Sequence, residues 1–167
     1  MGQEGKWILY RLIFETRRAR AKLAKRALEL GNGHVHILVN NAGIFPFGPT
    51  HETTEEVFDG AYSFNVKAPF FLVAELAPLM AKNGKGAIVN VSTMVADYGA
   101  VGMSLYGSTK AALNLLTKAW AAEYGPSGVR VNVVTALVFG PATLCFSVHI
   151  VLGVGRWDQG KDDPRNN

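Results

Sequence analysis

ILVNNAG, residues 37–43, combines a short apolar run with an abrupt polar turn. Consecutive apolar residues that include β-branched side chains are typical of a strand buried on both faces, as in parallel sheets. The same pattern returns in AIVNVST at residues 87–93 and in VRVNVV at residues 129–134. The sequence therefore predicts three buried strands, the first two of which end in polar residues.

Helical patterns lie between these strands. One runs from about residue 65 to 82, and a stronger one runs from 104 to 124. A short helix before them is predicted to open on a capping box formed by Thr53 and Glu56. Strands that alternate with helices are joined by right-handed crossovers into a parallel sheet, which predicts an α/β fold.

The positive charge of the chain is concentrated at its start. The net charge is +4, and residues 1–30 hold eight Lys or Arg and three Glu. Apolar residues recur at helical spacing from Leu23 to Leu30, and Gly31 ends the pattern. We therefore interpret the basic residues as the solvent face of an amphipathic helix and expect no nucleic-acid partner.

The composition indicates which broad classes of protein the chain can belong to. Hydrophobic residues make up 49% of the chain, which is typical of a globular protein. The lone cysteine, Cys145, excludes an internal disulfide and predicts a reducing, cytoplasmic location. The tail at residues 136–155 carries no charge, and its apolar length makes a membrane anchor the weaker alternative. Gly140 and Pro141 interrupt that stretch, so we expect no membrane span.

Tyr106 and Lys110 stand four residues apart at the start of the predicted helix 104–124, so they share one helix face. An ammonium group beside a phenol favours the phenolate and is expected to lower the pKa of Tyr106. Such a pair donates a proton to a carbonyl oxygen or removes one from an alcohol. The spacing is common by chance, and its interpretation depends on the surrounding motifs.

Those motifs together resemble one family. ILVNNAG, FNVKAPFFL at residues 64–72, AIVNVST and YGSTKAAL at residues 106–113 occur in the order typical of short-chain dehydrogenases/reductases. The resemblance covers about residues 21–134. It implies a Rossmann-like three-layer α/β fold with a parallel sheet, and hydride transfer between NAD(H) or NADP(H) and a small ketone or secondary alcohol.

The resemblance also implies roles for individual residues. Tyr106 is expected to be the catalytic acid-base, and Lys110 is expected to tune it and to hold the nicotinamide ribose. Asn65 matches the asparagine that positions a water in the proton relay. The family's turn after the first of these strands stabilises the sheet and lines the cofactor cleft, and here it consists of Asn40, Asn41, Ala42 and Gly43.

A hydroxyl that binds the substrate oxygen is expected at the end of the strand 87–93. The family places it thirteen residues before the tyrosine, which is Thr93 here, whereas Ser92 is the adjacent alternative. Neighbouring strand residues point to opposite faces, so only one of the two can serve. We predict Thr93. No metal site is expected, because the pair His34 and His36 lacks a third ligand.

Other parts of the family pattern are missing. The phosphate-binding turn Thr-Gly-x-x-x-Gly-x-Gly does not occur, and the sequence contains no Thr-Gly pair. We expect a partial fold that lacks the first βα units and the C-terminal substrate region. The predicted organisation is a dehydrogenase/reductase domain at residues 1–135 and a divergent tail at residues 136–167.

Two functional hypotheses follow. The first is an NAD- or NADP-dependent oxidoreductase. The second is an inactive chain that associates with itself or with a full-length relative, because a proton relay cannot replace a hydride carrier. The helices at residues 65–82 and 104–124 resemble the pair that forms the family's dimer interface, so a homo-oligomer is expected under either hypothesis.

Overall fold

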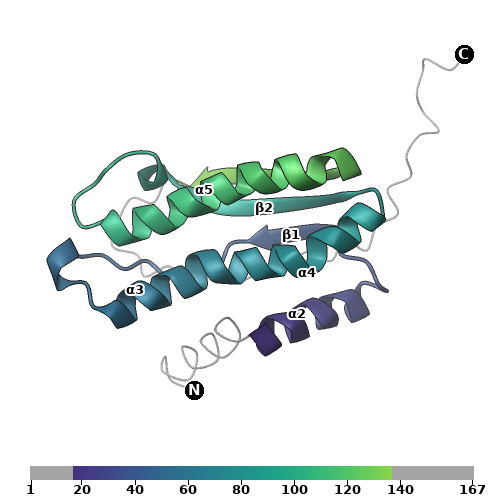
Figure 1. Cartoon of the computed structure of the whole chain (residues 1–167), viewed down its shortest axis with the longest axis horizontal. Helices are drawn as coiled ribbons and strands as arrows, with labels where there is room; N and C mark the ends of the chain where they lie inside the picture. Colours follow the sequence, from purple (N-terminus) through teal and green to yellow (C-terminus); the bar gives the residue numbers. More distant parts are fainter. Residues whose placement is uncertain (1–16, 137–167) are drawn as a thin grey trace, which may run out of the picture.

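The computed structural model describes residues 17–136 of the chain. Its helices and strands alternate as the sequence predicts (Figure 1). In chain order they are α2 (Arg17–Leu30), β1 (Ile37–Asn40), α3 (Glu55–Tyr62), α4 (Ala68–Lys82), β2 (Gly86–Thr93), α5 (Ser104–Tyr124) and β3 (Val129–Ala136).

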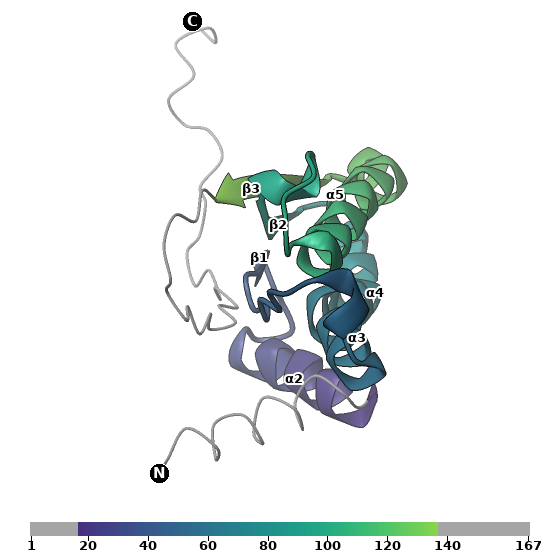
Figure 2. The same ribbon diagram turned by 90° about the vertical axis from the view of Figure 1, so that its left-hand side faces the viewer.

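The three strands form one parallel sheet in the order β1-β2-β3, which confirms the predicted α/β fold. Leu38 lies opposite Ile88, and Ile88 lies opposite Val131. Both crossovers run in the same direction, and right-handed connections then place their helices on the same face of the sheet. Figure 2 shows α4 and α5 together on that face. The described residues thus form two layers of the predicted Rossmann-like arrangement.

The core lies between the sheet and these helices. Leu38 and Ile88 are fully buried against Leu72 and Leu76 of α4 and Leu113 of α5. Burial of each such side chain contributes about 1.5–3 kcal/mol to folding, so the core fixes α5 firmly against the sheet.

Helix α4 tolerates two prolines. Pro69 lies in its first turn, where a backbone N–H has no helical partner to lose. Pro78 lies inside the helix on its exposed side. The π-helical turn Ser63–Lys67 joins α3 to α4, so the helical rod is continuous from Glu55 to Lys82. This rod is long and apolar enough to cross a membrane by length and composition, but its apolar side packs into the core.

The predicted start of α3 was wrong by one residue. Thr54, not Thr53, is the N-cap, and its hydroxyl accepts a hydrogen bond from the backbone N–H of Val57. The Thr53 hydroxyl instead donates to the carbonyl of Pro49 at 3.4 Å. A short 3-10 turn at Thr50–Glu52 occupies the preceding residues and shifts the helix start.

Helix α2 is amphipathic. Ala24 and Ala27 are buried, whereas Lys22 and Lys25 are exposed. Arg20 departs from this pattern, because it is buried with its guanidinium 4.9 Å from the centre of the Phe71 ring in α4. Figure 1 shows α4 between α2 and α5. Most of the basic face therefore points to solvent, and one arginine joins α2 to α4.

The predicted domain boundary and the predicted tail lie at or beyond the end of the residues that the structure describes. The predicted domain boundary after residue 135 falls inside β3, which runs to Ala136. The apolar tail, from residue 137 onward, and the first sixteen residues lie outside the described part of the chain.

Candidate active site

A buried chain of polar side chains joins β1 and β2 to α5. The side chain of Asn40 in β1 donates from Nδ2 to Oδ1 of Asn90 in β2 at 2.8 Å. Asn90 in turn donates from Nδ2 to Oγ1 of Thr117 at 2.8 Å, and Thr117 donates to the carbonyl of Leu113 at 2.7 Å. It reaches α5 at Thr117, seven residues beyond Lys110, and does not include the backbone of Ile44.

Asn65 clamps the turn that follows Asn40. Its Oδ1 accepts from the backbone N–H of Ile44 at 2.9 Å, and its Nδ2 donates to the carbonyl of Ile44 at 2.9 Å. Nδ2 also donates to Oγ1 of Thr109 at 3.0 Å. Asn65 lies in the π-helical turn Ser63–Lys67, a local geometry that often occurs at functional sites.

Gly43 brings this turn close to the catalytic candidates. A Cβ atom at residue 43 would lie 3.1 Å from Oδ1 of Asn65 and 3.5 Å from Nζ of Lys110. A Cβ here would be in ordinary contact with Lys110 and would require Asn65 to shift by a few tenths of an ångström. Asn41 and Ala42 are half-buried beside it, with Ala42 packed against the core. The structure thus brings Gly43, Asn65 and Lys110 together.

Tyr106 and Lys110 are both buried in the first two turns of α5. Nζ of Lys110 donates to the carbonyl of Val91 in β2 at 2.8 Å and lies 5.8 Å from the centre of the Tyr106 ring. The ring of Phe45 meets the Tyr106 ring edge-on, with 4.6 Å between the centroids. Lys110 is therefore anchored to β2 and lies near the ring of Tyr106.

The expected lowering of the Tyr106 pKa was wrong. Burial raises the pKa of Tyr106 above its ordinary value, since the charged phenolate loses solvation. Burial also lowers the pKa of Lys110 to about 8, so part of the population is uncharged near neutral pH. The ammonium group of Lys110 is committed to the Val91 carbonyl, and desolvation dominates the pKa of the phenol. Tyr106 in this chain is therefore protonated at neutral pH.

Ser92 and Thr93 end β2 on opposite faces of the sheet. Ser92 is buried on the face that bears Asn90, toward the helices, and its Oγ makes no hydrogen bond within the described part of the chain. Thr93 lies on the other face with a buried side chain. Neither hydroxyl is hydrogen-bonded to Tyr106 among the described residues.

The lack of a side chain at Gly107 allows the residues after Thr93 to approach α5 closely. A Cβ atom at Gly107 would lie only 2.7 Å from the carbonyl oxygen of Val95, a distance at which the backbone would have to shift. The short 3-10 turn Met94–Ala96 therefore approaches the helix directly beside Tyr106. This contact links the residues that follow Thr93 to the first turns of α5.

Lys110, which the family resemblance expects to hold a nicotinamide ribose, lies beside Gly43 of the turn that is expected to line the cofactor cleft. No phosphate turn precedes β1 among the described residues, because the segment GNG at residues 31–33 ends α2. Asn32 adopts the left-handed conformation, with φ of 51°, and the N–H of Gly33 bonds to the carbonyl of Leu28 at 2.7 Å. That pattern is a helix C-terminal motif, whereas phosphates bind at helix N-termini.

Sequence reasoning missed two residues of this region. Thr109 bonds to Asn65 and donates to the carbonyl of Tyr106, and Phe45 covers the Tyr106 ring. The bond from Thr109 was accessible to sequence reasoning, since a helical threonine commonly donates to the carbonyl three or four residues earlier. Phe45 carried no such signal, because it lies in an irregular loop.

The parallel sheet with helical crossovers defines a protein of the Rossmann-like class. The chain matches the model of the short chain dehydrogenase family over residues 2–143, and it belongs to that family. An uncharacterized oxidoreductase of Thermotoga maritima is 46% identical over 102 residues, which are 61% of this chain and 41% of the relative. Carbonyl reductase (NADPH) 2 of Sus scrofa is 42% identical over 109 residues, 65% of this chain and 45% of the relative.

Solved structures of short-chain oxidoreductases have a similar fold. A metagenomic short-chain oxidoreductase in complex with NADP has a TM-score of 0.69 and 32% identity, with coverage of 73% of this chain and 55% of that one. NAD⁺-bound xylitol dehydrogenase has a TM-score of 0.72 and 26% identity, with coverage of 78% and 50%. The chain spans a little less than half the length of the curated relatives it matches.

Proposed function

We propose that this chain carries the proton-transfer site of an NAD(P)(H)-dependent oxidoreductase that interconverts a small ketone and a secondary alcohol. The observation that supports the proposal is the convergence of Gly43, Asn65 and Lys110 beside Tyr106, on one buried hydrogen-bonded frame. The relatives named above include a carbonyl reductase and an NAD⁺-bound dehydrogenase, which is consistent with this reaction class.

The chemistry is divided between the cofactor and the protein. A bound NADPH or NADH supplies the hydride for the carbonyl carbon. Tyr106 donates its phenolic proton to the carbonyl oxygen, although burial raises its pKa and makes it a weaker acid. Thr93 is the proposed hydroxyl that holds the same oxygen. Lys110 holds the ribose and, with a pKa of about 8, can return a proton to Tyr106 near neutral pH.

Asn65 has a more restricted role than a free relay residue. Both ends of its side chain are engaged by Ile44 and Thr109, so its amide positions the turn rather than a water. We therefore assign Asn65 to the proton-transfer site as a positioning residue. Any water of the relay would have to bind to other groups nearby.

Titration of the purified chain with NADPH and with NADH tests the proposal and compares the two cofactors. Saturable micromolar binding, followed by reduction of small ketones, supports it. The variant Tyr106→Phe should keep cofactor affinity and lose turnover, because it removes only the proton donor. Absence of dinucleotide binding with both cofactors would refute the proposal for this chain.

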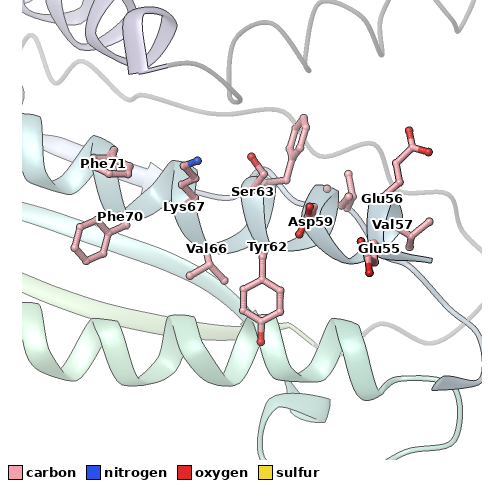
Figure 3. A pocket seen from close by; sticks show the side chains of 13 residues that line it. Glu55, Glu56, Val57, Asp59, Tyr62, Ser63, Val66, Lys67, Phe70 and Phe71 are labelled. Carbon is pink, nitrogen blue, oxygen red and sulfur yellow. The ribbon is translucent and has the colours of Figure 1, made fainter. Parts of the chain in front are cut away.

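A second candidate function is association without catalysis. It is favoured by the large apolar side chains that the helices expose. The outer side of α3, α4 and α5 exposes Phe58, Phe70 and Leu115. Figure 3 shows a surface hollow here, where Tyr62 and Phe70 point toward α5. Its lining excludes Tyr106 and Lys110, so it is distinct from the proposed catalytic site.

Under this candidate the chain forms a homo-oligomer through that apolar surface. Light scattering at micromolar concentration should then give at least twice the mass of one chain, and a monomer would count against it. A cytoplasmic location is also proposed, on the basis of the lone Cys145. Cell fractionation would test that location.

A further inference from the structure

Thr109 stands between the two catalytic candidates, three residues after Tyr106 and one before Lys110. Its side chain is fully buried. Its hydroxyl donates to the carbonyl of Tyr106 at 2.8 Å and accepts from Nδ2 of Asn65 at 3.0 Å. Thr109 thus provides a direct polar link between α5 and the π-helical turn that carries Asn65.

The hydroxyl also fixes the orientation of the Asn65 amide. A hydroxyl has one hydrogen to donate, and that of Thr109 goes to the Tyr106 carbonyl. Thr109 can therefore only accept from Asn65, which places Nδ2 toward α5. The same orientation gives the Ile44 carbonyl its donor and the Ile44 N–H its acceptor. All four bonds are satisfied together only in this arrangement.

We propose that Thr109 is a positioning residue that holds the Gly43–Ile44 turn against the Tyr106 end of α5 through Asn65. An effect of Thr109 on turnover rests on the proposed function, whereas its support of the Gly43–Ile44 turn does not depend on any cofactor. Both backbone groups of Ile44 bond to the Asn65 side chain rather than to a strand, so the local hydrogen bonds of the turn depend on the position of Asn65. Loss of the Thr109 hydroxyl should therefore release this turn selectively.

The test compares three variants of the full chain by amide hydrogen exchange at Ile44. Thr109→Val keeps the shape of the side chain and removes the hydroxyl, and Thr109→Ser keeps the hydroxyl. Thr117→Val is the matched control. Thr117 lies on the same helix, accepts from Asn90 and donates to Leu113, and so belongs to a network that does not include Ile44.

The expected result is a loss of Ile44 protection of about tenfold to a hundredfold in Thr109→Val. Protection should return in Thr109→Ser and stay within about twofold of the parent chain in Thr117→Val. Unchanged protection in Thr109→Val overturns the inference. An equal loss in Thr117→Val also overturns it, since that result reports general loosening of the fold.

Turnover separates this inference from the proposed function. Selective exchange at Ile44 in a chain with no turnover of any ketone supports the positioning role and refutes the oxidoreductase. In a chain with turnover, Thr109→Val should lower kcat and Thr109→Ser should restore it. Normal kcat in Thr109→Val refutes the catalytic meaning of the link.

Discussion

The buried amine of Lys110 should give the stability of this chain an unusual pH dependence. Its pKa is lowered from 10.5 to about 8 by burial, and the side chain is only 4% exposed. In the unfolded chain the amine stays protonated up to about pH 10.5, while the folded chain releases its proton near pH 8. The free energy of unfolding should therefore rise with pH between those values.

The size of the effect follows from the two pKa values. A shift of one pKa unit corresponds to about 1.4 kcal/mol, so the full cost of the charged amine in the fold is about 3 kcal/mol. Between pH 7 and pH 9.5 the fold should regain about 2 kcal/mol of that cost. The window stays below pH 10, because the raised pKa of Tyr106 makes the folded chain lose stability at higher pH.

Urea unfolding from pH 7 to pH 9.5 measures this change. Other titrating groups contribute to the profile, so the comparison is with Lys110→Met, which keeps the length of the side chain and carries no charge. The parent chain should gain about 2 kcal/mol relative to this variant over the window. Parallel profiles would refute the assignment of a lowered pKa to Lys110.

Three further predictions concern the frame around the site. Gly107→Ala should lower the free energy of unfolding by up to about 2 kcal/mol, because its Cβ would lie 2.7 Å from a backbone carbonyl oxygen. The control Gly60→Ala in α3 should raise the free energy of unfolding by about 0.5–1 kcal/mol. Thermal melts that show equal gains in both variants would contradict the close approach at Gly107. Thr93→Ala should abolish ketone turnover and Ser92→Ala should retain it; the reverse pattern in initial rates would move the role to Ser92. Asn65→Asp should cost at least about 2 kcal/mol in urea unfolding, because it loses two donated hydrogen bonds in a buried place; an unchanged midpoint would contradict the clamp.

The sequence was sufficient to predict the elements that carry strong patterns. The apolar runs that became β1, β2 and β3 were identified, and α5 begins at Ser104 and ends at Tyr124 as predicted. These elements are specified by local composition and periodicity, which can be read without knowledge of the tertiary contacts. The start of α3 was less predictable, because Thr53 and Thr54 are equally good caps and the preceding 3-10 turn decides between them.

The chemistry of the site was predictable only in part. Spacing placed Tyr106 and Lys110 on one helix face, but the direction of the Tyr106 pKa depends on burial, which the sequence does not state. The engagement of Asn65 by Ile44 and Thr109 depends on the fold, since these residues are far apart in sequence from Asn65. Long-range contacts of this kind are determined by tertiary packing rather than by local pattern.

The most direct test of the proposed site is the initial rate of ketone reduction by the parent chain and by Tyr106→Phe, with NADPH and with NADH. The parent chain is predicted to turn over with at least one cofactor. Tyr106→Phe is predicted to be slower by about a hundredfold to ten-thousandfold, with the same cofactor affinity. Equal rates in the two proteins would contradict the role of Tyr106, and a parent chain without turnover would favour association as the function.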